Sequence, residues 1–110
     1  MSVVKNSLKL DADELVVKFG LASLHIVRGK KPVGGNLYLT NKRLCFRSKG
    51  LLFRKQIDVS LCRLESMCKG DMSNEMHIRV KTDAGDVRDV ILHVWGIDDW
   101  LQKINKQVLR

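Results

Sequence analysis

The chain has 110 residues, of which 45% are hydrophobic, and a formal net charge of +8. A chain of this length is expected to form one domain over residues 1–110 and to bury a core without disulfides or metal. No apolar run approaches the roughly 18 residues of a membrane span and the N-terminus lacks a signal sequence. We therefore expect a cytoplasmic domain that at most lies peripherally on a membrane.

The three cysteines argue against a disulfide framework and against a metal centre. Cys45, Cys62 and Cys68 are odd in number and unevenly spaced, which favours reduced thiols. Zinc would need paired ligands such as C-x-x-C or H-x₃-H, and the sequence has neither. We predict no metal site and no cofactor.

The excess of positive charge is concentrated in residues 28–55. The rest of the chain carries eleven bases and all twelve acids, a net charge of −1. Such asymmetry favours an anionic partner, namely phospholipid headgroups, nucleic acid or an acidic protein surface, although a solvated face that only aids solubility is the alternative. The nine bases of this stretch, which contains no acid, are Arg28, Lys30, Lys31, Lys42, Arg43, Arg47, Lys49, Arg54 and Lys55.

Period-two alternation of apolar residues predicts about seven short strands between residues 14 and 94. The clearest pair is a hairpin in which Asn41 and Lys42 form the turn, with Tyr38 and Cys45 on the outer face. Its inward residues are Leu37, Leu39, Leu44 and Phe46. The predicted strands are 14–19 and 22–28, interrupted at Gly20, then 36–40, 43–48, 56–61, 64–68, 75–82 and 87–94, with a loop over 29–35.

The period then changes to that of a helix over residues 97–109. Asp98 or Asp99 is expected to cap its N-terminus, and Trp100 to plug the open end of the sheet. The apolar stripe consists of Ile97, Trp100, Leu101, Ile104 and Val108.

The segment from Gly35 to Phe46, GNLYLTNKRLCF, resembles the G-x-L-x-L-T-x-x-R-L-x-F signature of GRAM and bacterial pleckstrin-homology-like domains. Weaker similarity continues over residues 56–67, and the whole resemblance spans about 13–108. It implies a mainly β (α+β) fold, a PH-like barrel of about seven antiparallel strands capped by a C-terminal helix. Members of this superfamily bind phosphoinositides, peptides or other proteins, so the resemblance also implies a binding module.

No catalytic site is predicted, and we expect the protein not to be an enzyme. His25, His77 and His93 alternate with apolar neighbours in strands, without a nucleophile at a local spacing that would pair with them. Nucleic acid is also disfavoured as a partner, because stacking platforms need exposed aromatic rings and only Tyr38 is predicted to point outward.

The segment around Leu51, Leu52 and Phe53 is the candidate membrane contact, because bases flank it on both sides. These apolar side chains either enter a bilayer or fold back on the barrel. We predict that the basic face docks on an anionic membrane surface or an acidic protein by electrostatic attraction. The alternative is a protein-interaction or self-assembly domain that pairs through a strand edge without binding lipid.

Overall fold

The computed structural model describes residues 9–25, 32–49, 56–72 and 74–109. Within these ranges the chain forms strands, one short 3-10 helix and one α-helix. Along the chain they are β1 (Val16–His25), β2 (Val33–Thr40), β3 (Arg43–Ser48), β4 (Gln56–Ser60), the 3-10 helix η2 (Leu61–Arg63), β5 (Leu64–Lys69), β6 (Glu75–Lys81), β7 (Val87–Val94) and α1 (Ile97–Val108).

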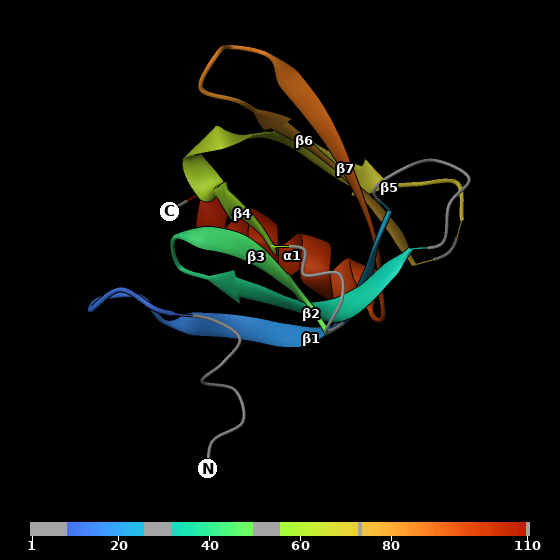
Figure 1. Cartoon of the computed structure of the whole chain (residues 1–110), viewed down its shortest axis with the longest axis horizontal. Helices are drawn as coiled ribbons and strands as arrows, with labels where there is room; N and C mark the ends of the chain where they lie inside the picture. The colour runs from blue at the N-terminus through green and yellow to red at the C-terminus, as the bar shows by residue number, and fades with distance from the viewer. Residues whose placement is uncertain (1–8, 26–31, 50–55, 73, 110) are drawn as a thin grey trace.

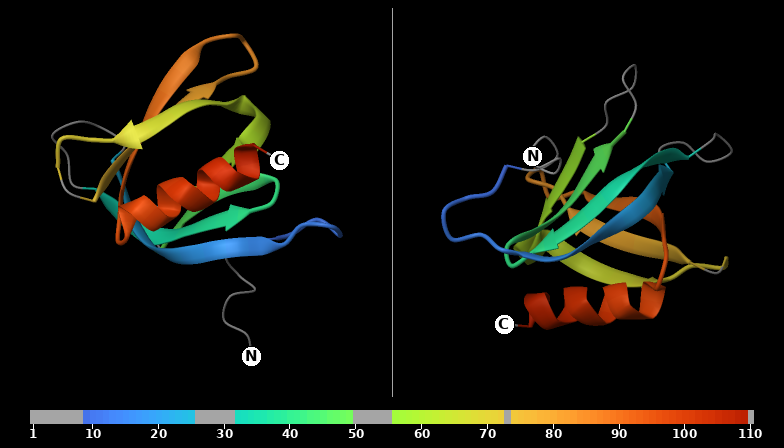
Figure 2. Two further views of the ribbon diagram at one scale, coloured as in Figure 1. Left: turned by 180° about the vertical axis from the view of Figure 1, so that it is seen from behind. Right: turned by 90° about the horizontal axis from the view of Figure 1, so that it is seen from below.

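The strands form one antiparallel seven-stranded sheet in the order β4-β3-β2-β1-β7-β6-β5 (Figure 1). β4 and β5 are consecutive in the chain, joined by η2, yet they are the two outer strands, so the sheet curls back on itself. α1 contacts β1, β5 and η2 and lies across the opening between the two halves of the sheet (Figure 2). The predicted architecture is therefore confirmed.

Apolar side chains from both halves of the sheet and from α1 fill the interior. Trp100 is 2% exposed and belongs to the same cluster as the strand residues, which confirms its predicted role as a plug. The alternation read from the sequence also holds in the hairpin, whose inward residues are all buried. The main core residues are Leu24, Leu37, Leu39, Leu44, Phe46, Val59, Met76, Ile78, Leu92, Val94, Ile97, Trp100 and Ile104.

The first strand differs from its prediction. The sequence indicated two strands interrupted at Gly20, whereas β1 continues through this glycine and pairs with β2 from Val16 opposite Thr40 to Leu24 opposite Val33. Cross-strand hydrogen bonding over this length outweighs the low strand propensity of one glycine. The predicted loop over 29–35 was also too long, because β2 already begins at Val33.

Tyr38 and Cys45 lie on the outer face of the sheet, as predicted, but both are buried. The ring of Phe19 stacks on Tyr38 with centroids 5.9 Å apart. Cys45 lies opposite Asp58 in the ladder between β3 and β4, and Arg47 pairs with that carboxylate. The expectation of an exposed Tyr38 ring was therefore wrong, because neighbouring side chains on the same face cover it.

The start of α1 also differs from its prediction. Gly96, in a left-handed conformation (φ 68°, ψ 48°), occupies the N-cap position without a side-chain hydrogen bond. Asp98 and Asp99 lie in the first turn, where their charge suits the helix dipole. Asp99 accepts a 2.7 Å hydrogen bond from Lys18, whose ammonium group lies 5.0 Å from the centroid of the Trp100 ring. The helix is thus fastened to β1 rather than capped by an aspartate.

Gly35 provides a test of this packing. A Cβ at this position would overlap the Arg47 carbonyl oxygen and lie 2.8 Å from Ser48 Cα, whereas a Cβ at Gly34 meets nothing within 4 Å. We expect Gly35→Ala to lower the free energy of unfolding by about 1–3 kcal/mol. The matched change Gly34→Ala should alter it by less than about 0.5 kcal/mol. Urea denaturation of both variants measures the difference, and equal effects would contradict the packing.

Candidate functional site

A buried carboxylate lies just before β1. The Glu14 side chain is 0% exposed, although it is ionised. Thr40 Oγ1 donates a 2.6 Å hydrogen bond to Oε2, and Arg43 donates to the same oxygen through Nε at 2.8 Å and to Oε1 through Nη2 at 3.1 Å. The hydrogen bonds from Arg43 are the main reason that the pKa of Glu14 falls to about 2, against the opposing effect of burial.

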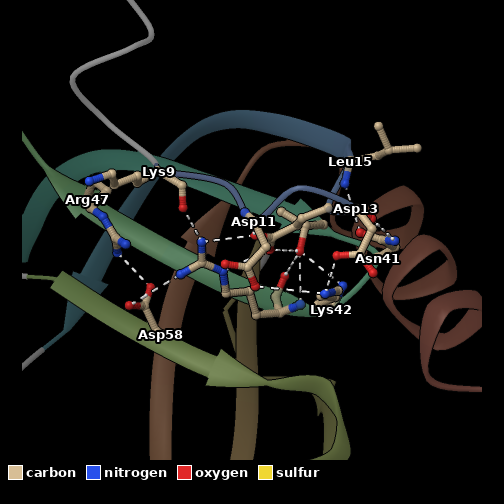
Figure 3. Close-up of polar contacts among 11 residues, drawn as sticks. Lys9, Asp11, Asp13, Leu15, Asn41, Lys42, Arg47 and Asp58 are labelled. Carbon is tan, nitrogen blue, oxygen red and sulfur yellow. Dashed lines mark hydrogen bonds and ion pairs between the residues drawn. The ribbon is translucent and has the colours of Figure 1, made fainter.

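The β2–β3 turn holds the residues that precede β1. Lys42 Nζ lies 2.6 Å from Asp13 Oδ1 and 3.8 Å from Asp11 Oδ2. The Asn41 side chain accepts a 2.9 Å hydrogen bond from the Leu15 N–H and donates to the Asp13 carbonyl oxygen at 3.2 Å. Figure 3 shows these side chains gathered at the turn. The signature motif therefore anchors a distant segment as well as forming a hairpin.

A second ion pair lies on the outer face of β3 and β4. Arg47 Nη1 is 2.8 Å from Asp58 Oδ1 (Figure 3), and Arg43 Nη1 is 3.7 Å from Asp58 Oδ2. Cys45 lies in the same ladder, where burial raises the pKa of its thiol to about 12. This cysteine is protonated at neutral pH, so it is an apolar packing residue rather than a nucleophile.

These contacts change the interpretation of the basic stretch. Lys42, Arg43 and Arg47 each pair with a carboxylate from outside residues 28–55. The acids that neutralise them are separated from the bases in the sequence and become neighbours only through strand pairing. The sequence analysis did not predict that Glu14 pairs with the hairpin. The acidic residues within 11–14, just before a strand that pairs with the hairpin, could have indicated it.

Lys49 is the fourth of the nine predicted bases that the structure describes. It lies at the end of the hairpin opposite the turn. Its side chain is exposed, and within the described ranges it makes no ion pair. The other predicted contacts lie outside the residues that the structure describes. They are the bases Arg28, Lys30, Lys31, Arg54 and Lys55 and the apolar residues Leu51, Leu52 and Phe53.

Lys49 borders an open groove of about 440 Å³ on the outer face of the sheet. The floor is formed by β1 and the start of β2, where Ala22 lies opposite Gly35. Trp95, 76% exposed, lies at one wall just after β7. The complete lining is Leu21, Ala22, Ser23, Gly34, Gly35, Lys49, Asn74, His93, Val94 and Trp95.

The groove combines hydrogen-bond donors with an apolar wall. Lys49, Ser23, Asn74 and the Trp95 indole can all donate hydrogen bonds, which suits a ligand that carries an oxyanion. Tryptophan is also typical of the interface between lipid and water, where one part of the ring is apolar and the N–H is solvated. No local pattern in the sequence predicts this groove, because its lining comes from five separate segments.

An apolar strip continues from the groove along β1. Leu15, Val17, Phe19 and Leu21 are exposed large hydrophobic residues on this strand or directly before it. β7 pairs with β1 only at Ala22–His25, so the first part of the strand has no β7 partner. Several exposed apolar side chains on one short segment are typical of an interaction site.

Two absences apply to the described residues. No helix among them is long and apolar enough to cross a membrane. No group of three or more histidine, cysteine, aspartate or glutamate side chains in these ranges has the geometry to hold a metal ion. Cys62 and Cys68 are exposed free thiols.

The chain matches the family model of the GRAM domain over residues 3–95. No curated protein sequence matches it. Among solved structures, it is similar to the C-terminal domain of an unknown protein from Leishmania infantum, at 20% identity and TM-score 0.67, covering 88% of this chain and 86% of that one.

It is also similar to the DH/PH domains of p115-RhoGEF, at 10% identity and TM-score 0.71, and of human ARHGEF11 in a ternary complex with human RhoA and its inhibitor, at 11% identity and TM-score 0.72. Each match covers 86% of this chain, but only 30% and 29% of those longer chains. At these identities the similarity shows a PH-like fold alone.

The Glu14 carboxylate predicts how stability depends on pH. Its folded pKa of about 2 is below the ordinary value of 4.5, so the stabilisation is complete above pH 4.5 and is lost as the pH falls towards 2. We expect Glu14→Gln to lower the free energy of unfolding at neutral pH by about 2–3 kcal/mol, because the partly buried Arg43 loses its counter-charge.

Chemical denaturation at several pH values measures this effect, with the exposed Glu65→Gln as control. A Glu14→Gln loss that does not shrink in acid would contradict the assignment.

Proposed function

The chain belongs to the GRAM domain family, and we propose that it is a peripheral binding module that docks on anionic membranes through the groove end of the barrel. The observation that carries the proposal is the contrast between the two ends of the β2–β3 hairpin. The bases at the turn are paired with carboxylates, whereas Lys49 at the opposite end is exposed beside Trp95.

Two basic segments of the chain are attached at this end. Residues 26–31 leave from the end of β1 and join the start of β2, and residues 50–55 connect Lys49 to β4. The described flanks are close together, because Gly35 pairs with Ser48 and Arg47 with Gln56. We therefore include the bases of both segments in the proposed docking face. Those bases are Arg28, Lys30, Lys31, Arg54 and Lys55.

Electrostatic attraction supplies most of the proposed affinity. Each lysine or arginine near an anionic leaflet contributes about 1 kcal/mol, and exposed Trp95 adds an interfacial anchor. We extend the proposal to Leu51, Leu52 and Phe53, which would enter the bilayer between Lys49 and the Arg54–Lys55 pair. An acidic protein surface would use the same bases but would leave these apolar residues without a role.

The three paired bases are left out of the proposed docking face. Engaging Arg43 or Arg47 with lipid phosphate would break its ion pair with Glu14 or Asp58. For Arg43, this would leave a buried carboxylate without its partner, which costs several kcal/mol. These side chains therefore serve the fold.

Liposome co-sedimentation tests the proposal. We expect the chain to bind vesicles that contain phosphatidylglycerol and not pure phosphatidylcholine, with affinity falling as salt rises. Arg54→Glu with Lys55→Glu should weaken binding by at least tenfold, and Lys49→Glu by about fivefold, from the loss of roughly 1 kcal/mol per base.

The matched control is Lys81→Glu, the same change at the far end of β6, which should leave binding unchanged. Binding that ignores lipid charge, or equal losses in all variants, would overturn the proposal. Binding to an acidic protein without any binding to vesicles would favour the other partner class.

A second candidate function is self-association through the apolar strip on β1. The strip is favoured by the exposure of Phe19 and Leu21 and by the absence of a β7 partner for Val16–Leu21. A second copy would cover this surface and extend the sheet by strand pairing. RhoA is present with DH/PH domains in the solved complexes of two neighbours, so protein association is compatible with the fold.

Light scattering after size exclusion, at several concentrations, tests self-association. We expect mass to rise with concentration, and Phe19→Ser with Leu21→Ser to abolish the rise. Met72→Ser, at another exposed apolar residue outside the strip, is the control. A monomer mass at all concentrations excludes this candidate.

A further inference from the structure

All three histidines of the chain lie on one patch of the outer sheet face, although they are distant in sequence. His93 on β7 is opposite Ser23 on β1 and Glu75 on β6. His25 and His77 are both opposite Ile91, in the next row of the same face. Residues directly opposite in an antiparallel ladder share a face, so the histidines and Glu75 form one cluster.

The central feature of this cluster is a pair of stacked imidazoles. The ring centroids of His25 and His93 are 4.5 Å apart, with the planes tilted by 44°. In the part of the chain that the structure describes, Nε2 of each ring is buried and lacks a hydrogen-bond partner. Buried polar atoms without partners cost free energy, so both rings are placed to gain from a new interaction.

A carboxylate lies beside this pair. Glu75 Oε2 is 3.9 Å from His93 Nε2, which is too long for a hydrogen bond but close enough to stabilise a charged imidazole. Its other oxygen, Oε1, lies 3.0 Å from His77 Nε2. One negative charge is therefore shared by two histidines, and a fully protonated cluster carries excess positive charge.

Few other charged groups of the described chain face the cluster. From β5, Cys68 is opposite His77, and Lys69 is already paired with Asp98. The start of β2, opposite Ser23 and Leu24, contributes no titratable side chain. Arg79 and Asp89 lie opposite each other in the row beyond Ile91 and pair at 3.1 Å. Lys49 lines the groove together with His93.

We propose that the His25–His93 pair makes docking of the groove on the phosphate groups of lipid headgroups proton-dependent, with tighter binding in mildly acidic conditions. This inference rests on the proposed function. Free imidazole gains its proton near pH 6.5. Protonation of the pair would add positive charge next to the groove that His93 lines together with Lys49.

Vesicle binding at about pH 7.5 and about pH 5.5, on either side of the midpoint of free imidazole, tests the inference. Phosphatidylglycerol is the probe lipid, because its phosphodiester remains charged across this range. We expect wild type to bind on the order of tenfold more tightly at the lower pH, from one to two added charges near the surface. The double variant His25→Gln with His93→Gln should bind at both pH values without this increase.

His77→Gln is the matched control, since it removes a histidine of the same cluster that is not part of the stacked pair and should keep most of the response. Thermal unfolding of each variant checks that it is folded, and a histidine NMR titration of wild type reads the protonation of the pair directly. Wild-type binding that is equal at both pH values, or a response lost only in His77→Gln, overturns the inference and leaves membrane docking intact. No vesicle binding at either pH overturns the proposed function, and the inference with it.

Discussion

The rest of the structure depends on the buried carboxylate of Glu14. It accepts hydrogen bonds from Thr40 and Arg43, the two residues that flank the β2–β3 turn. An ionised group without exposure is tolerable only when its partners replace the lost hydration. Thr40 Oγ1 in turn accepts hydrogen bonds from the backbone N–H groups of Lys42 and Arg43. The same interaction thus fixes the turn, the entry into β1 and the charge state of the hairpin.

Ion pairing at the turn of the hairpin separates the bases that stabilise the fold from those for which we propose a binding role. At the turn, Lys42 and Arg43 are committed to carboxylates. At the opposite end, Lys49 is exposed on a groove whose wall carries Trp95. The formal net charge of +8 is therefore not spread over one uniform face: along the hairpin, the bases at the turn are paired and the lysine at the other end is exposed.

The outer face of β1 connects the features of this end. Phe19 and Leu21 extend the apolar surface away from the groove. Farther along the strand, His25 stacks on His93. Apolar side chains and a titratable group thus share the outer face of one strand. In a sheet, alternate side chains of one strand share a face, so a surface of mixed chemistry can be built from a few residues.

The sequence alone determined the strand alternation, the hairpin, the amphipathic helix with its buried Trp100 and, through the signature motif, the GRAM family. These depend on local periodicity, which is encoded within a few consecutive residues. Only the tertiary structure decided which bases are free and which side chains meet. The pairing of Glu14 with Arg43, the covering of Tyr38 by Phe19 and the assembly of the groove join residues distant in the sequence. Their physical cause is strand register, which single-residue chemistry does not specify.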